Sequence, residues 1–161
     1  MLKKIFTRLN FFFCRKKYHM QILYFYILTW IMTLLFFPLM YITRNVFGNE
    51  DGGPGVTNWF IIIVVAPILE TFIFQRGVFK ISTSLKPVKG KQALIILLSA
   101  FIFGLVHPYN LGYMLFAFSI GIVLAYVYYL FHRNPQKAFW TTALIHSLRN
   151  ATAVLLVAFF P

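Results

Sequence analysis

The sequence predicts an all-α protein, a multi-pass transmembrane helical bundle of about five spans. Two features of its composition predict this fold. Hydrophobic residues make up 60% of the 161-residue chain and charged residues only 11%, and the mean hydropathy is +0.77. A soluble domain usually carries about 25% charged residues, so this chain has too few to cover a soluble surface. Function must therefore be sought within a membrane.

Residues 1–19 form a basic segment that we predict to lie at the membrane interface, ahead of one transmembrane domain over residues 20–161. The apolar residues of this segment recur at helical spacing, so a basic interfacial helix is expected over residues 2–17. They are Leu2, Ile5, Phe6, Leu9, Phe12 and Phe13. The next apolar run is longer than that of a signal peptide and no small-residue cleavage site follows it, so it is predicted to be a retained span. Cys14 is the only cysteine, which excludes an internal disulfide.

A membrane-spanning helix needs about 20 mostly apolar residues. Five runs meet this need, and the third is short: 20–43, 58–79, 92–107, 112–131 and 138–160. The expected connections are a turn-rich loop at 44–57, a lysine-rich loop at 80–91, a tight turn at 108–111 and a short polar loop at 132–137. His107 follows Lys91 by 16 residues, about 24 Å along a straight helix, which places it near the outer surface unless the third helix begins deeper or tilts.

The basic residues are distributed unequally between the two sides of these spans. With the N-terminus inside, the inner segments hold twelve of the fifteen Lys and Arg residues and the outer loops hold only Arg44. This positive-inside pattern predicts a cell-membrane protein with a cytoplasmic N-terminus. The net charge of +12 does not indicate nucleic-acid binding, because the basic residues lie between apolar runs and not on one polar face.

Glu70 is the only carboxylate within a predicted span. His107 ends the third span, and His146 and Asn150 are four residues apart, on one face of the last span. Ionisable groups inside a bilayer are costly and usually functional. A carboxylate can activate water, imidazoles can orient that water or bind a metal, and an amide can stabilise an oxyanion, so the set suits hydrolysis of an amide bond. The alternative role for Glu70 is a buried ion pair, with Arg149 or Arg76, that holds helices together.

Other types of intramembrane hydrolase fit the sequence poorly. It has no H-E-x-x-H zinc motif and no pair of aspartates within the spans. Ser119 and Ser147 lack the glycine context of an exposed serine nucleophile.

The residues of this set resemble the motifs of the CPBP intramembrane proteases, also called the CAAX-protease and bacteriocin-processing or Abi family, which includes type II CAAX prenyl endopeptidases. That family carries E-E-x-x-x-R, F-x-x-x-H and H-x-x-x-N on separate membrane helices. Here Glu70 matches the first glutamate, Phe103 with His107 matches the second motif, and His146 with Asn150 matches the third, all within residues 58–155.

The chain departs from the first family motif at two positions. Thr71 stands in place of the second glutamate and Gln75 in place of the arginine. Arg76 comes one residue late, about 100° around a helix from Gln75.

The resemblance implies an intramembrane endopeptidase that cleaves a membrane-associated peptide or protein, of a lipidated or bacteriocin type, with membrane lipid as its surroundings. It assigns catalysis to Glu70, His107, His146 and Asn150, with the glutamate and the first histidine activating water and the last two residues steadying the tetrahedral intermediate. The supporting positions are Thr71, Gln75, Phe103 and Arg149. Whether a divalent metal such as zinc takes part stays open; its ligands would be Glu70, His107 and His146.

Two other functions fit the same residues. One is a catalytically inactive relative, an immunity or peptide-binding membrane protein that uses the same cavity. The other is a small proton-coupled transporter that uses Glu70. The two histidines and Asn150 favour hydrolysis over transport, since a transporter would need only the carboxylate.

Overall fold

A computed structural model of the chain describes residues 2–43, 58–88 and 90–159, and within these ranges all the regular secondary structure is helical. The elements are α1 (Leu2–Cys14), α2 (Tyr18–Ile42), η1 (Ile61–Val65), α3 (Ala66–Glu70), η2 (Thr71–Gly77), α4 (Val78–Ser84), α5 (Gln92–Leu105), α6 (Leu111–Leu130) and α7 (Pro135–Phe159).

Four helical stretches among the described residues are long and apolar enough to cross a membrane: α2, the continuous run from η1 to α4, α6 and α7. We call the run from η1 to α4, Ile61–Ser84, the second span. Helix α5 is apolar but has only 14 residues. The predicted all-α membrane bundle is confirmed, with four full-length helices and one short one.

Two of the predicted loops are shorter than expected. The loop predicted at 80–91 begins only at residue 85, because α4 continues to Ser84. The hydroxyls of Thr83 and Ser84 bond back to carbonyls of the preceding turn, and the helix ends before Pro87, which disfavours helical backbone in the residue ahead of it.

The loop predicted at 132–137 is also shorter, because α7 begins at Pro135. Proline suits the first helical position, and the Asn134 side chain caps the helix by accepting the Lys137 N–H at 3.1 Å. The predicted loop at 44–57 lies outside the described residues.

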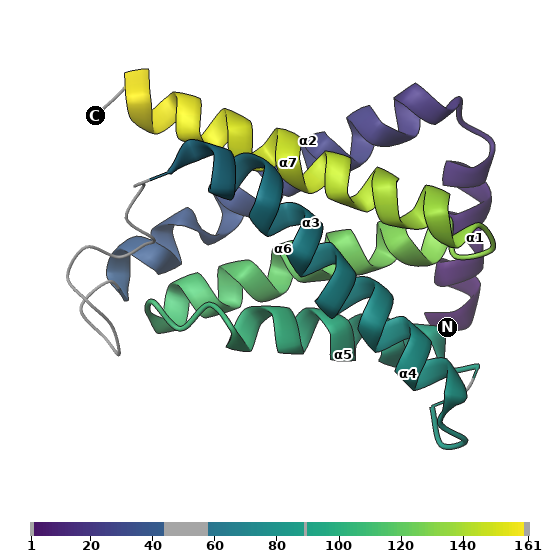
Figure 1. The fold of residues 1–161 in the computed structure, drawn as a ribbon. Coiled ribbons are helices and arrows are strands. Elements are labelled where there is room, and N and C mark those ends of the chain that lie inside the picture. The colour runs from purple at the N-terminus through teal and green to yellow at the C-terminus, as the bar shows by residue number, and fades with distance from the viewer. Residues whose placement is uncertain (1, 44–57, 89, 160–161) are drawn as a thin grey trace.

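The spans run side by side, and α1 lies across one end of the bundle (Figure 1). That end also holds the connections at 85–91 and 131–134, whereas the turn at 106–110 and the C-terminal end of α7 lie at the opposite end. Helix α6 is the most buried of the long helices. Its residues Phe116, Leu124 and Val127 pack with Phe25 of α2 and Ile145 of α7 to form the main core.

Helix α6 approaches its neighbours closely at glycines. A Cβ atom at Gly121 would lie 2.9 Å from the Ala100 Cα of α5, and one at Gly112 would lie 2.7 Å from the Leu39 carbonyl oxygen of α2. Small residues of this kind let membrane helices pack backbone to backbone. The core therefore fixes α5 and α2 against α6 and so determines where the ends of these helices lie.

Candidate active site

Glu70 lies in the second span between two π-helical stretches, η1 and η2. Pro67 explains part of this irregularity, because it has no N–H to donate to a carbonyl of the preceding turn. The π-register is seen where the Ala66 N–H bonds to the Ile61 carbonyl, five residues back. In the same register the Ile62 carbonyl would need the N–H of Pro67, which does not exist. Such π-stretches occur frequently at functional sites.

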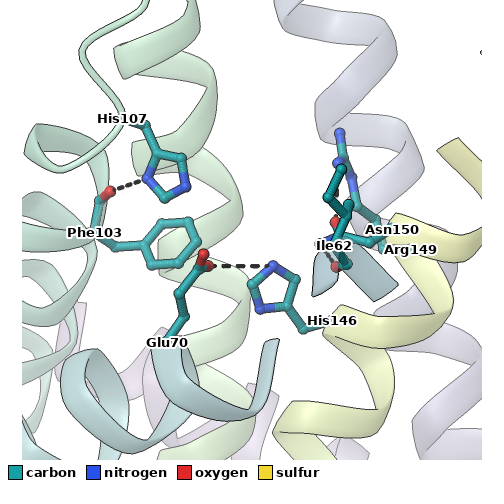
Figure 2. A network of polar contacts seen from close by, with 7 residues as sticks. All are labelled: Ile62, Glu70, Phe103, His107, His146, Arg149 and Asn150. Atoms are coloured by element: carbon teal, nitrogen blue, oxygen red, sulfur yellow. Dashed lines mark hydrogen bonds and ion pairs between the residues drawn. The ribbon is translucent and has the colours of Figure 1, made fainter. Parts of the chain in front are cut away.

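The Glu70 carboxylate faces His146 of α7 (Figure 2). Glu70 Oε2 lies 3.6 Å from His146 Nε2, and the side chains are 23% and 6% exposed, respectively. Within the described ranges this contact with His146 is the one that Glu70 makes to a basic side chain, and no ion pair joins Glu70 to Arg76 or Arg149. Arg76 is exposed and lies over the Phe72 ring at 5.6 Å.

His107 lies just beyond the C-terminus of α5. Its backbone N–H bonds to the Gly104 carbonyl, so the Phe103 carbonyl, one of the last of the helix, receives no N–H from residue 107. The His107 ring supplies the donor, with Nδ1 2.7 Å from the Phe103 oxygen. A carbonyl oxygen only accepts, so Nδ1 carries the proton, and in the neutral ring Nε2 holds the free lone pair. The four-residue spacing of F-x-x-x-H thereby fixes the tautomer of this histidine.

The buried ring of Phe103 connects the two histidines. Its centroid lies 4.6 Å from that of His107 and 5.7 Å from that of His146. Figure 2 shows the ring between His107 and the Glu70–His146 pair. The sequence left the depth of His107 uncertain. In the structure its ring turns back onto Phe103, which also contacts His146 on the last span.

Asn150 lies one turn beyond His146 and is directed at the second span (Figure 2). Its Nδ2 donates to the Ile62 carbonyl at 3.0 Å, and its Oδ1 accepts from Arg149 at 3.2 Å. Asn150 therefore supplies the hydrogen bond that Pro67 cannot. The Arg149 guanidinium also lies over the Phe116 ring, 5.0 Å from its centroid.

Thr71 and Gln75, the two departures from the family motif, are both fully buried. Neither the Thr71 hydroxyl nor either end of the Gln75 amide has a hydrogen-bond partner among the described residues. Arg76 does not replace the missing arginine, because its side chain is exposed while that of Gln75 is buried.

The three residues considered as metal ligands do not form a ligand group. In the described part of the chain, no three His, Cys, Asp or Glu side chains are gathered closely enough to hold a metal ion. Glu70 and His146 face each other, whereas His107 lies across the Phe103 ring from them. The arrangement of these side chains does not fit a metal site.

Tyr113, in the first turn of α6, is a site residue that the sequence did not single out. Its ring centroid lies 6.2 Å from that of His107. A tyrosine near a span end is typical of the membrane interface, so the sequence carried no signal for this role.

The arrangement places a carboxylate against one imidazole and leaves the Nε2 of a second imidazole free. A carboxylate held in this way can accept a proton from water, and the unprotonated Nε2 of His107 can accept a hydrogen bond. The carboxylate and the two imidazoles come from three separate helical elements: the second span, the end of α5 and α7.

A family model described as type II CAAX prenyl endopeptidase Rce1-like matches residues 53–152. This match includes every residue of the site described above. Comparisons with curated proteins and with solved structures found no match.

Proposed function

Because the chain belongs to the Rce1-like family of type II CAAX prenyl endopeptidases, we propose that it is an endopeptidase that cleaves a membrane-associated peptide with water activated by Glu70. The observation that carries this proposal is the pairing of Glu70 with His146. It unites the sole carboxylate of the predicted spans with a histidine 76 positions later in the sequence.

In the proposed reaction Glu70 takes a proton from a water molecule, and the oxygen of that water attacks the carbonyl carbon of the scissile peptide bond. The tetrahedral intermediate then collapses, its C–N bond breaks, and the proton passes from Glu70 to the leaving amine. His146 orients the carboxylate through the 3.6 Å contact. His107 accepts a hydrogen bond from the water through Nε2, since its protonated Nδ1 is engaged by the Phe103 carbonyl. Asn150 acts mainly by positioning α7 against the second span.

The test is proteolysis by the purified full chain in liposomes, with membrane-anchored peptides carrying a lipidated C-terminal cysteine as candidate substrates. Glu70→Gln keeps the size and hydrogen bonding of the side chain but cannot act as a base. We expect cleavage, measured by mass spectrometry of the products, to fall by about 10²–10⁴-fold. Equal cleavage by wild type and Glu70→Gln would remove Glu70 from the mechanism.

Two histidines provide a matched pair of variants. The Nδ1 atoms of His107 and His132 both contact a backbone carbonyl at a helix end, those of Phe103 and Tyr129. Only His107 lies beside the Glu70–His146 pair. We expect His107→Ala to abolish cleavage and His132→Ala to leave it within about twofold. A similar loss in both variants would mean that capping of the helix end, and not chemistry, explains the effect.

A second candidate function is favoured by Thr71 and Gln75. Neutral, unpartnered groups at the two altered motif positions fit a relative that binds a peptide without cleaving it. In that case wild type and Glu70→Gln would bind the same lipidated peptide with similar affinity, and neither would cleave any member of the set.

The two altered positions also allow a separate prediction. Thr71→Glu alone would bury an unpaired carboxylate and should lower the free energy of unfolding by about 3–5 kcal/mol. Adding Gln75→Arg should recover most of that loss, because the two new charges can pair, and should raise cleavage above that of wild type. Denaturation in mixed micelles measures the first effect and the proteolysis assay the second. If the losses in free energy of unfolding caused by Thr71→Glu and by Gln75→Arg add up to the loss in the double variant, the two new side chains do not interact.

A further inference from the structure

Helix α1 presents one face to the bundle. On that face the Phe13 ring packs 4.5 Å from the Phe25 ring of α2, and the Tyr126 hydroxyl of α6 donates to Asn10 Oδ1 at 2.8 Å. At the α1–α2 corner, Gln21 Nε2 donates to the Phe13 carbonyl at 2.7 Å. The helix is therefore held by α2 and α6 in a fixed position across the end of the bundle (Figure 1).

Two further aromatic side chains of α1, Phe11 and Phe12, are only partly covered by the described chain. Phe11 is 62% exposed and Phe12 is 49% exposed. Each ring carries a cation from the next helical turn: the Arg15 guanidinium lies 4.8 Å from the Phe11 centroid, and the Lys16 ammonium lies 4.7 Å from the Phe12 centroid. These four side chains line an open cavity of about 340 Å³, which we call the α1 cavity.

Among the described residues, the two cations of the α1 cavity have no anionic partner. The chain has three acidic residues. Glu70 is paired with His146 inside the bundle, and Glu50 and Asp51 follow the first span, which separates them from α1 in the sequence. Within the described residues neither Arg15 nor Lys16 forms an ion pair. A ligand that complements this surface must carry a negative charge for the two cations and an apolar part that covers the two exposed aromatic rings.

We propose that the α1 cavity binds the headgroup of an anionic phospholipid, with the phosphate between Arg15 and Lys16 and the rings of Phe11 and Phe12 among the upper parts of the acyl chains. A small soluble anion would satisfy the charges but leave both rings in water. A zwitterionic lipid would cover the rings but brings no net negative charge. At an anionic bilayer surface, the lipid phosphate neutralises the two cations and the acyl chains cover the two aromatic rings.

The test uses the purified full chain in detergent micelles, titrated with phosphatidylglycerol or phosphatidylcholine, and native mass spectrometry counts the lipid molecules retained. Wild type should retain phosphatidylglycerol in preference to phosphatidylcholine. Arg15→Gln with Lys16→Gln should raise the apparent Kd for phosphatidylglycerol by about thirtyfold, the effect of two basic side chains at a membrane surface. All four side chains are exposed or half-buried, so circular dichroism should show unchanged helix content.

A matched control removes the same charge elsewhere at the same end of the molecule. Lys86→Gln with Lys91→Gln changes two exposed lysines of the 85–91 connection and should leave the affinity within about twofold. An equal loss in this control would overturn the site in favour of diffuse attraction. Unchanged affinity in the Arg15 and Lys16 variant, or displacement of the lipid by equimolar inorganic phosphate, would also overturn it. None of these outcomes depends on whether the protein is a protease.

Discussion

The Asn150 side chain illustrates how one residue can complete the backbone of another helix. Pro67 leaves the Ile62 carbonyl without a donor in the π-register, and Asn150 Nδ2 fills that position at 3.0 Å. An unsatisfied carbonyl in a lipid environment costs several kcal/mol, so this bond joins α7 to the second span at a point where the helix would otherwise be weak. The contact lies one turn from His146, so the bond also sets where His146 meets Glu70.

Asn150→Ala should therefore lower the free energy of unfolding by about 1–3 kcal/mol, the cost of an unpaired buried acceptor. Pro67→Ala restores the missing N–H, so in that background the Asn150→Ala loss should shrink to under about 1 kcal/mol. Denaturant titration of the four proteins in mixed micelles measures this cycle. If the loss is the same in both backgrounds, Asn150 does not act through the Ile62 carbonyl.

Among the helices, the contact between α5 and α6 depends on the missing side chain of Gly121. Gly121→Ala would bring a methyl group within 2.9 Å of the Ala100 Cα, a backbone atom that cannot move cheaply. We expect a loss of about 1–3 kcal/mol, typical of overpacking. Gly77→Ala is the control, because its nearest neighbour lies 3.4 Å away. Gly77→Ala should change the thermal stability little or raise it. If Gly77→Ala and Gly121→Ala lower the stability equally, the loss comes from replacing any helical glycine and not from the contact with Ala100.

The spans could be predicted from the sequence because each is a long apolar run between polar segments. The same reasoning missed the true end of α4, since Lys80 and Ser84 are polar yet remain helical through bonds to their own turn. It also brought out Glu70 and His146 as rare polar residues in apolar runs. It did not indicate Tyr113 or Ile62, because a tyrosine and an isoleucine are ordinary in a membrane helix and act here only through tertiary neighbours.

At the scale of the whole molecule, the placement of charge predicts the orientation. Helix α1 and the segment that follows α4, which includes Lys86 and Lys91, lie at one end of the bundle (Figure 1). We expect this end to face the cytoplasm. In a Cys14→Ser background, Glu50→Cys should react with a membrane-impermeant thiol reagent in intact cells, and Lys91→Cys should react only after lysis. Reaction of Lys91→Cys in intact cells would reverse the predicted topology.

The shortness of α5 has a consequence for the bilayer around the protein. Its 14 residues extend about 21 Å, while a typical hydrocarbon core is roughly 30 Å thick. We therefore expect lipid beside α5 to thin to match it, and this hydrophobic mismatch lies on the helix that carries Phe103 and leads to His107. Water and a peptide bond anchored at the surface would reach the site there by a shorter path. Cleavage should accordingly be faster in short-chain than in long-chain phosphatidylcholine vesicles, and a rate independent of chain length would show that the bilayer does not deform at α5.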